Sequence, residues 1–245
     1  MSSVIITGAS SGIGRSVALQ LAKSGKYEYI SINSGHDEKA LADVAHLIEE
    51  ISDKIKVITV FGDISQNITA KALIKKTVSV AGGVDALINS AAISYVGLLM
   101  DMNPDEWRQT VAVNLDSVYN TCHEVLPYMV KEKRGRIINI SSVWGLVGAS
   151  CEVAYSATKG AVNAFTKALA KEMALSGIAV NAIAFGAVDT RMNGHLSDEE
   201  KNELAESIAI GRMATPEEAA DTVIKMLEMP DYLTGEVLKC DGGWI

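Results

Sequence analysis

Seven short apolar runs, separated by segments of helical periodicity, place the strongest constraint on how this 245-residue chain can fold. Each run is apolar on consecutive residues, which is typical of strands covered by helices on both faces. Strands that alternate with helices pair in parallel. The sequence therefore predicts an α/β fold with a doubly wound, seven-stranded parallel sheet. The predicted strands are residues 4–7, 29–32, 56–63, 85–92, 135–142, 178–185 and 236–243.

Two long helices are expected after the fourth and fifth strands. The first begins with Asn103 as N-cap and Pro104 in the first turn, and the second ends near Gly177, a residue suited to a helix C-terminus. No internal repeat, low-complexity tract or Pro/Ser-rich linker interrupts the pattern. We therefore expect one domain over residues 1–245.

The longest and most polar connection lies between the sixth and seventh strands. It contains a second helix start at Thr215, followed by Pro216. The part before it, residues 191–208, has two interpretations, a mobile lid over a substrate or an ordinary solvated helix. The sequence leaves both open.

Composition argues against several classes of function. A net charge of −8 disfavours nucleic acid as a partner. No apolar run reaches about 18 residues, and no secretory leader pattern is present, so we expect a cytoplasmic protein without a membrane span. Cysteine and histidine spacing suggests neither disulfides nor a metal site. These residues are Cys122, Cys151, Cys240, His36, His46, His123 and His195.

The first strand runs into a glycine-rich turn, TGASSGIG, at residues 7–14. Glycine permits positive φ and lets phosphate oxygens approach the backbone, and a helix N-terminus attracts anions. A strand, a glycine turn and a helix in this order are the context that a dinucleotide site needs. Alone, the turn is equally compatible with a plain strand-to-helix junction.

Tyr155 and Lys159 are four residues apart on a predicted helix, so their side chains share one face. A phenol is a poor proton donor or acceptor at neutral pH, but a nearby ammonium favours the phenolate. This pair therefore suits acid–base chemistry, and we expect Lys159 to lower the pKa of Tyr155.

The glycine turn and the Tyr-x-x-x-Lys pair together resemble those of the short-chain dehydrogenase/reductase family, and the similarity extends over nearly the whole chain. The resemblance implies a Rossmann-like fold and hydride transfer between a nicotinamide and a carbonyl or alcohol carbon. It assigns Tyr155 as the general acid/base, Lys159 as its modulator and ribose ligand, and Ser142 as the hydroxyl that orients the substrate oxygen. Asn114 matches the residue that holds a water in a proton relay.

The resemblance also implies a set of cofactor contacts. Two segments depart from the family pattern, because Ser90 and Ala92 replace asparagine and glycine, and Phe185 replaces a proline. The expected cofactor-binding residues are Gly8, Ser10, Ser11, Gly12, Ile13, Gly14, Asn33, Ser34, Asp63, Ile64, Asn89, Ser90, Ala91, Tyr155, Lys159, Gly186, Val188 and Thr190.

The choice between NADP and NAD depends on the end of the second strand. NAD-preferring relatives usually carry an acidic residue there, and this chain has Asn33 and Ser34 instead. The missing carboxylate favours NADP. However, Ser11 supplies no positive charge where NADP-preferring relatives often have Arg or Lys. NADP is the favoured cofactor, with NAD as the alternative.

Within the family, the chain is most similar to 3-oxoacyl-(acyl-carrier-protein) reductases of fatty acid biosynthesis. An acidic carrier protein would need a basic docking patch, for which the segment KEKRGR, residues 131–136, is the candidate. One alternative is an NAD-linked sugar, polyol or other small alcohol dehydrogenase. The other is a non-catalytic nucleotide-binding regulator, and the four catalytic matches argue against this second alternative. A homotetramer is expected, with Trp244 and Ile245 either buried at its interface or packed on their own subunit.

Overall fold

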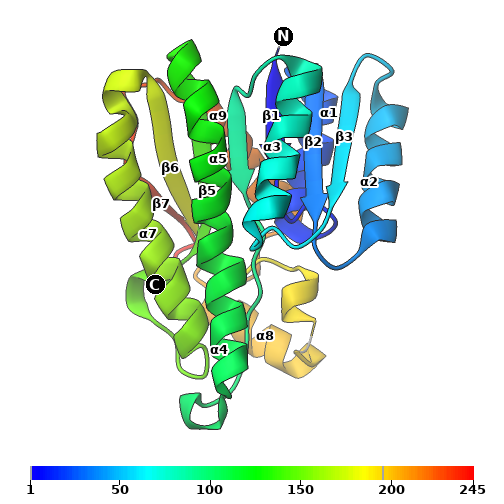
Figure 1. Ribbon diagram of the computed structural model, residues 1–245. Helices are drawn as coiled ribbons and strands as arrows, with labels where there is room; N and C mark the ends of the chain where they lie inside the picture. Colours follow the sequence, from blue (N-terminus) through cyan, green and yellow to red (C-terminus); the bar gives the residue numbers. More distant parts are fainter. Residues whose placement is uncertain (1, 195) are drawn as a thin grey trace.

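The computed structural model describes residues 2–194 and 196–245, and its seven strands form one parallel sheet in the order β3-β2-β1-β4-β5-β6-β7 (Figure 1). This arrangement confirms the predicted doubly wound fold. The strands are β1 (Ser3–Ile6), β2 (Tyr29–Ser34), β3 (Lys56–Phe61), β4 (Ala86–Asn89), β5 (Gly135–Ser142), β6 (Ile178–Phe185) and β7 (Val237–Cys240).

Helices cover both faces of the sheet (Figure 1). One face packs against α1 (Gly12–Ser24), α2 (Glu38–Ile51) and α9 (Pro216–Glu228), and the other against α3 (Asn67–Ala81), α5 (Ser117–Glu132) and α7 (Val153–Met173). The shorter helices are η1 (Leu99–Asp101), α4 (Pro104–Val111), η2 (Ala112–Asp116), α6 (Trp144–Val147), η3 (Ala174–Ser176), η4 (Arg191–Asn193) and α8 (Asp198–Ser207).

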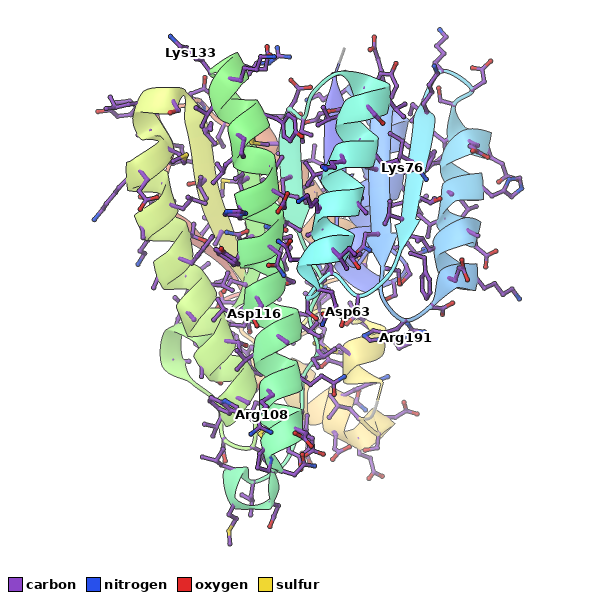
Figure 2. All side chains as sticks on the ribbon, viewed as in Figure 1. Asp63, Lys76, Arg108, Asp116, Lys133 and Arg191 are labelled. Carbon is purple, nitrogen blue, oxygen red and sulfur yellow. The ribbon has the colours of Figure 1, made fainter. Side chains whose placement is uncertain are left out.

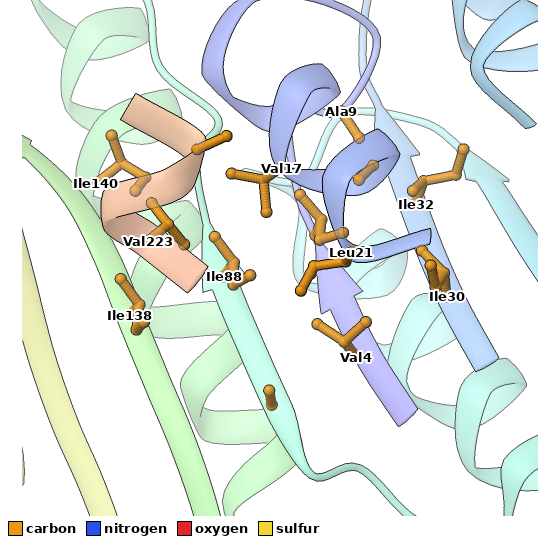
Figure 3. Packing of buried hydrophobic residues seen from close by; sticks show 14 of the residues in the cluster. Val4, Ala9, Val17, Leu21, Ile30, Ile32, Ile88, Ile138, Ile140 and Val223 are labelled. Atoms are coloured by element: carbon orange, nitrogen blue, oxygen red, sulfur yellow. The ribbon is translucent and has the colours of Figure 1, made fainter. Parts of the chain in front are cut away.

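Consecutive strand residues point into two different hydrophobic cores. Val4 and Ile6 of β1 join the core beneath α1 and α9, where they lie with Leu21 and Val223 (Figure 3). Ile5, between them, joins the core beneath α3, α5 and α7. Complete burial of each such side chain contributes about 1.5–3 kcal/mol relative to exposure. This double burial explains why the strands read as continuous apolar runs.

The helix caps expected from the sequence are present. Asn103 and Thr215 each form a capping box with the glutamate three residues later, and a proline follows each cap. Gly177 adopts a left-handed conformation at the end of the turn that follows α7. These caps satisfy backbone groups that a helix end would otherwise leave unpaired.

The first long helix is continuous but not uniform. Between α4 and α5 the chain makes one π-helical turn, η2, in which the Ser117 N–H donates to the carbonyl of Ala112, five residues earlier. Such a turn inserts one extra residue into the helix and frequently marks a functional site. Asn114 lies within this turn and is fully buried.

Four strands end earlier than predicted, and the residues beyond them become loops at the carboxyl edge of the sheet. β1 stops at Ile6, β3 at Phe61, β4 at Asn89 and β7 at Cys240. The sheet order also reverses direction at β1, which lies between β2 and β4. Ligands of doubly wound folds bind outside the carboxyl ends of the strands at such a switch point.

Two features that would indicate other functions were sought in the described residues. No helix within residues 2–194 and 196–245 combines the length and apolar character that crossing a membrane requires. Over the same residues, no group of three or more His, Cys, Asp or Glu side chains is arranged to hold a metal ion. His195 lies outside the described residues.

Candidate active site

A cleft of about 660 Å³ opens at the carboxyl ends of the strands, and most of the predicted site residues line it. It begins at the glycine turn after β1 and extends past the ends of β2, β4, β5 and β6. The predicted residues in its wall are Gly8, Ser10, Ser11, Gly12, Ile13, Asn33, Ser34, Asp63, Ile64, Ser90, Ala91, Ser142, Tyr155, Lys159, Gly186, Val188 and Thr190.

Three glycines give the turn after β1 its shape. Gly8 and Gly12 have positive φ values of 64° and 53°, and a Cβ on Gly8 would lie 2.8 Å from the Cα of Ala91. A Cβ on Gly14 would lie 2.5 Å from the carbonyl oxygen of Gly8. Gly14 itself does not line the cleft; it lets α1 pack directly on the turn. Larger residues at these positions would disrupt the backbone turn that exposes the N-terminus of α1 to the cleft.

The N-terminus of α1 can receive an anion. Ser11 is its N-cap residue, but the Ser11 side chain makes no capping hydrogen bond. The first N–H groups of a helix have no partner within the helix, and the helix dipole favours negative charge there. Together with the glycine backbone, this end of α1 fits a pyrophosphate.

The cleft wall at the end of β2 is polar, and the two residues there, Asn33 and Ser34, are uncharged. The hydroxyls of Ser34 and Ser10 lie 2.9 Å apart. The Asn33 amide donates to the carbonyls of Val60 and Gly62, while its Oδ1 atom is buried without a hydrogen-bond partner among the described residues. Polar groups of this kind fit the ribose and adenine of a dinucleotide.

Sequence reasoning missed a cation on the opposite side of this end of the cleft. Arg191 directly follows Thr190, and its guanidinium Nη1 lies 3.7 Å from Oδ2 of Asp37, the N-cap residue of α2. Figure 2 shows Arg191 where η4 approaches the loop between β2 and α2. The described residues that line the cleft include one arginine, Arg191, and one lysine, Lys159. Arg191 therefore places a guanidinium, ion-paired with Asp37, at an end of the cleft where Ser11 supplies no charge.

The catalytic candidates meet at the other end of the cleft. Ser142 is the last residue of β5, and Tyr155 and Lys159 lie one turn apart on α7. All three side chains are buried. The Lys159 ammonium donates to the carbonyl oxygen of Ile140 at 2.8 Å and lies 5.5 Å from the centre of the Tyr155 ring. The predicted helical pair is thus held against the end of β5.

Burial dominates the proton affinities of this pair, contrary to our expectation for the tyrosine. It raises the pKa of Tyr155 well above its ordinary value, the charge of Glu152 raises it further, and a hydrogen bond with Ser142 acts in the opposite direction. Burial lowers the pKa of Lys159 to about 8. The expected lowering of the tyrosine pKa by Lys159 is therefore not seen, because desolvation disfavours both charged forms.

Asn114 is the fourth catalytic candidate, and it lies behind the cleft wall. Its Oδ1 accepts from the N–H of Ile93 at 2.8 Å, and its Nδ2 donates to the Ile93 carbonyl at 2.8 Å and to the Thr158 hydroxyl at 3.1 Å. The amide thereby fixes the loop after β4 against α7. The proton relay predicted for Asn114 stays a prediction.

Asn89 was expected to contact the cofactor, but the structure places its side chain below the cleft. The amide donates to Asn139 at 2.9 Å and accepts from Thr121 at 2.7 Å. The N–H groups of Ser90 and Ala91 instead donate to the Thr7 hydroxyl. Because these contacts use backbone atoms, the serine at position 90 does not disturb the path of the chain.

Further residues that the sequence analysis did not select surround the reacting end. The rings of Trp144 and Trp244 pack with centroids 4.7 Å apart, and both line the cleft. Trp244 therefore packs on its own subunit. Glu152 also lines the cleft and accepts a hydrogen bond from Ser94 at 2.6 Å. Its place three residues before Tyr155, just ahead of the helix, was the available signal.

The basic segment at residues 131–136 cannot serve as a docking patch at this cleft. It precedes and begins β5, so it lies at the amino ends of the strands, and Figure 2 shows Lys133 at the top end of the molecule, far from Arg191. Arg134 pairs with Asp85 and Arg136 with Asp231. Its position, away from the cleft, is the observation that argues against the role that we expected for it.

The segment of residues 191–208, which we call the lid segment, contains η4 and α8. Met192, Leu196 and Leu204 from this segment line the cleft. Like Trp144 and Trp244, they contribute apolar side chains to the lining of the cleft. This placement agrees with a cover over the substrate end, and whether the cover moves stays a prediction.

Similar proteins share both the sequence and the architecture. A curated relative from Bacillus subtilis (strain 168), the uncharacterized oxidoreductase YmfI, is 39% identical over 98% of this chain and 97% of the relative. The 3-oxoacyl-[acyl-carrier-protein] reductase FabG of Chlamydia muridarum is 38% identical over 98% of this chain and 95% of its own length. FabG of Staphylococcus aureus (strain Mu50) is also 38% identical, over 98% and 97%.

A solved structure agrees with this result. The gluconate 5-dehydrogenase of Burkholderia cenocepacia J2315, in complex with NADP and tartrate, matches with a TM-score of 0.90 and 30% identity, over 99% of this chain and 94% of that one. The family profile described as short chain dehydrogenase matches residues 2–201. With the glycine turn, Ser142, Tyr155 and Lys159 around one cleft, the chain belongs to the short-chain dehydrogenase family of oxidoreductases.

Proposed function

We propose that this oxidoreductase uses NADPH to reduce the ketone of a 3-oxoacyl thioester to a secondary alcohol. The observation that carries the reaction type is the arrangement of Ser142, Tyr155 and Lys159 at one end of a cleft whose other end suits a dinucleotide. The identity of the thioester as the substrate is supported by the FabG relatives, at 38% identity over nearly the whole chain.

The residues of the cleft divide the work of binding. The glycine turn and the N-terminus of α1 hold the pyrophosphate, and Ser10, Ser34 and Arg191 surround the adenosine end. Asn33 and Ser34 carry no carboxylate that would repel a 2′-phosphate, and Arg191 is a cation at the same end of the cleft. Both features favour NADP over NAD. When bound, the nicotinamide supplies a hydride to the carbonyl carbon.

The protein supplies the proton and orients the ketone. Ser142 donates a hydrogen bond to the ketone oxygen, and Tyr155 gives that oxygen the proton from its hydroxyl as the carbon gains its bond to hydrogen. The phenolate that remains is stabilised by the Lys159 ammonium beside it. A raised pKa keeps Tyr155 protonated before the reaction, which is the form that a reductase needs.

The apolar wall supports an acyl chain as part of the substrate. Trp144 and Trp244 form one side of the reacting end, and Leu196 and Leu204 from the lid segment also line the cleft. Such a surface gains free energy when it covers an alkyl chain. The apolar wall supports our proposal of a reductase in fatty acid biosynthesis.

A sugar, polyol or other small alcohol dehydrogenase is the second candidate function. It is favoured by the gluconate 5-dehydrogenase match at TM-score 0.90 and by the polar pair Ser94 and Glu152 in the cleft. NAD is the alternative cofactor for such an enzyme. A non-catalytic regulator fits less well, because the complete catalytic group is present.

For the wider context we propose a cytoplasmic homotetramer, as the resemblance implies. An acyl carrier protein remains a candidate partner, although the docking surface must lie near the cleft mouth. Exposed apolar side chains on α4 and α5, Trp107 and Tyr119, are available for contacts between subunits.

A substrate panel tests the proposal. Purified protein is supplied with NADPH or NADH and with 3-oxoacyl thioesters of coenzyme A and of acyl carrier protein, with 5-ketogluconate and with a diketone. The proposal expects the highest kcat/KM for a thioester with NADPH. A preference for the sugar acid, or for NADH with every substrate, would replace it with the second candidate.

A further inference from the structure

The reacting end of the cleft contains one carboxylate among the described lining residues, that of Glu152. Glu152 stands at the N-cap position of α7, where a side-chain oxygen commonly accepts from the helix backbone. Its side chain makes no such bond. Instead, Oε2 accepts the hydroxyl of Ser94 at 2.6 Å, across the cleft wall. The carboxylate is therefore held away from its own helix and at the cleft surface.

Neighbouring backbone contacts fix this position. The N–H of Gly97 donates to the carbonyl of Cys151 at 2.8 Å, which joins the loop after β4 to the loop before α7. Asn114 clamps the same β4 loop at Ile93. The carboxylate of Glu152 thus sits between two segments whose relative position is set by several hydrogen bonds.

The charge of Glu152 reaches the reacting group. Glu152 lies just before α7, three residues ahead of Tyr155, and its charge raises the pKa of the tyrosine. Glu152 and Tyr155 line the same cleft, so a ketone that accepts a proton from Tyr155 binds in the cleft that also contains this carboxylate. In the partly buried cleft, water screens charges less than at an open surface.

We infer that Glu152 is a specificity-determining residue that rejects 3-oxo acids, in which one CH2 group separates the carboxylate from the ketone, and admits the neutral esters and thioesters. The inference rests on the proposed function, since it takes the ketone to bind at Tyr155. It deepens that proposal, because a 3-oxo acid and its thioester differ at this group alone. The free acid brings a negative charge toward Glu152, whereas the thioester does not.

A pair of small substrates isolates the effect. With NADPH, kcat/KM is measured for acetoacetate and for ethyl acetoacetate, which share the ketone but differ in charge. Any change in the pKa of Tyr155 affects both substrates and cancels in their ratio. In Glu152→Gln, we expect the preference for the ester over the acid to fall by about tenfold, an electrostatic effect of ordinary size for partly buried charges.

Two matched variants serve as controls. Glu152→Asp keeps the charge and should retain most of the preference for the ester. Glu228→Gln removes a carboxylate at the end of α9, outside the lining of the cleft, and should leave the preference unchanged. A preference in Glu152→Gln that stays within twofold of the wild-type protein would overturn the inference.

A binding measurement separates this inference from the proposed function. If the wild-type protein reduces neither acetoacetate compound nor a thioester, the proposed function fails. The NADP-loaded protein is then titrated by calorimetry with tartrate, a dianion, and with threitol, its neutral counterpart. Glu152→Gln should bind tartrate about tenfold more tightly relative to threitol. No gain in tartrate binding overturns the role of Glu152 independently of the reaction.

Discussion

The ammonium of Lys159 lies 5.5 Å from the centre of the Tyr155 ring, and its hydrogen bond goes to the backbone carbonyl of Ile140 rather than to the phenol. Lysine and tyrosine are thus fixed separately, one by β5 and the other by α7. The ammonium is placed to stabilise a phenolate without binding it beforehand. The pair consequently suits a phenol that stays protonated until it gives up its proton.

Tyr155→Phe tests the assignment of the proton donor. Removing the hydroxyl should lower kcat by about 10²–10⁴-fold, the usual contribution of a positioned acid or base. The dissociation constant for NADPH, measured by quenching of protein fluorescence, should change less than about threefold because the ring remains. Undiminished turnover in this variant would remove Tyr155 from the mechanism.

Lys159→Met tests the cost of burying an ammonium. The pKa of Lys159 is lowered to about 8 from an ordinary 10.5, so between these pH values the unfolded protein binds more protons and the stability of the wild-type fold rises with pH. Below pH 8 the full cost applies. The methionine variant should be more stable by roughly 1–3 kcal/mol at pH 7, and inactive.

Urea denaturation at several pH values measures this effect. The stability advantage of Lys159→Met should shrink as the pH rises from 8 toward 10.5. An advantage that is constant over this range would show that the lysine carries no unfavourable charge in the fold.

Gly14→Ala tests the close packing beneath the glycine turn. The new Cβ would lie 2.5 Å from the carbonyl oxygen of Gly8, a backbone atom that cannot move away without opening the turn. We expect a loss of about 1–3 kcal/mol in the free energy of unfolding and a marked loss of NADPH affinity. Gly83→Ala is the matched control, because no atom lies within 4 Å of its added Cβ. Equal effects of the two substitutions would contradict the packing argument.

Arg191→Gln tests the source of positive charge at the adenosine end. Binding of NADPH should weaken by about five- to tenfold, as loss of one partly screened charge contact predicts, and binding of NADH should weaken less. Titration with 2′,5′-ADP and 5′-AMP, which differ only in the 2′-phosphate, gives the same comparison without the nicotinamide. If both nucleotides lose affinity equally, Arg191 contacts the 5′-phosphate side of the cofactor instead of the 2′-phosphate.

Much of the fold and the centre of the site follow from local sequence. Double burial makes each strand a continuous apolar run, so the sheet could be predicted, and β5 and β6 have the predicted bounds. The glycine turn, Ser142, Tyr155 and Lys159 also line one cleft as expected. These predictions succeed because their signals are contained in short segments of chain.

The parts that could not be predicted depend on contacts between distant segments. Glu152 faces Ser94, and Trp144 packs on Trp244, across 58 and 100 residues of chain respectively. The basic segment at residues 131–136 failed as a docking surface because composition does not show which end of the sheet a loop occupies. The raised pKa of Tyr155 likewise reflects burial, which a four-residue spacing does not report.

The π-helical turn between α4 and α5 is a place where the deletion of one residue would inactivate this enzyme. Its one extra residue rotates α4, which precedes the turn, relative to α5, which follows it. Asn114 lies inside the turn. A deletion of one residue within Ala112–Asp116 would restore a regular helix and leave the packing of α5 intact. It would also turn the amide away from Ile93 and loosen the loop after β4. A single in-frame codon loss could thus separate the fold from its chemistry.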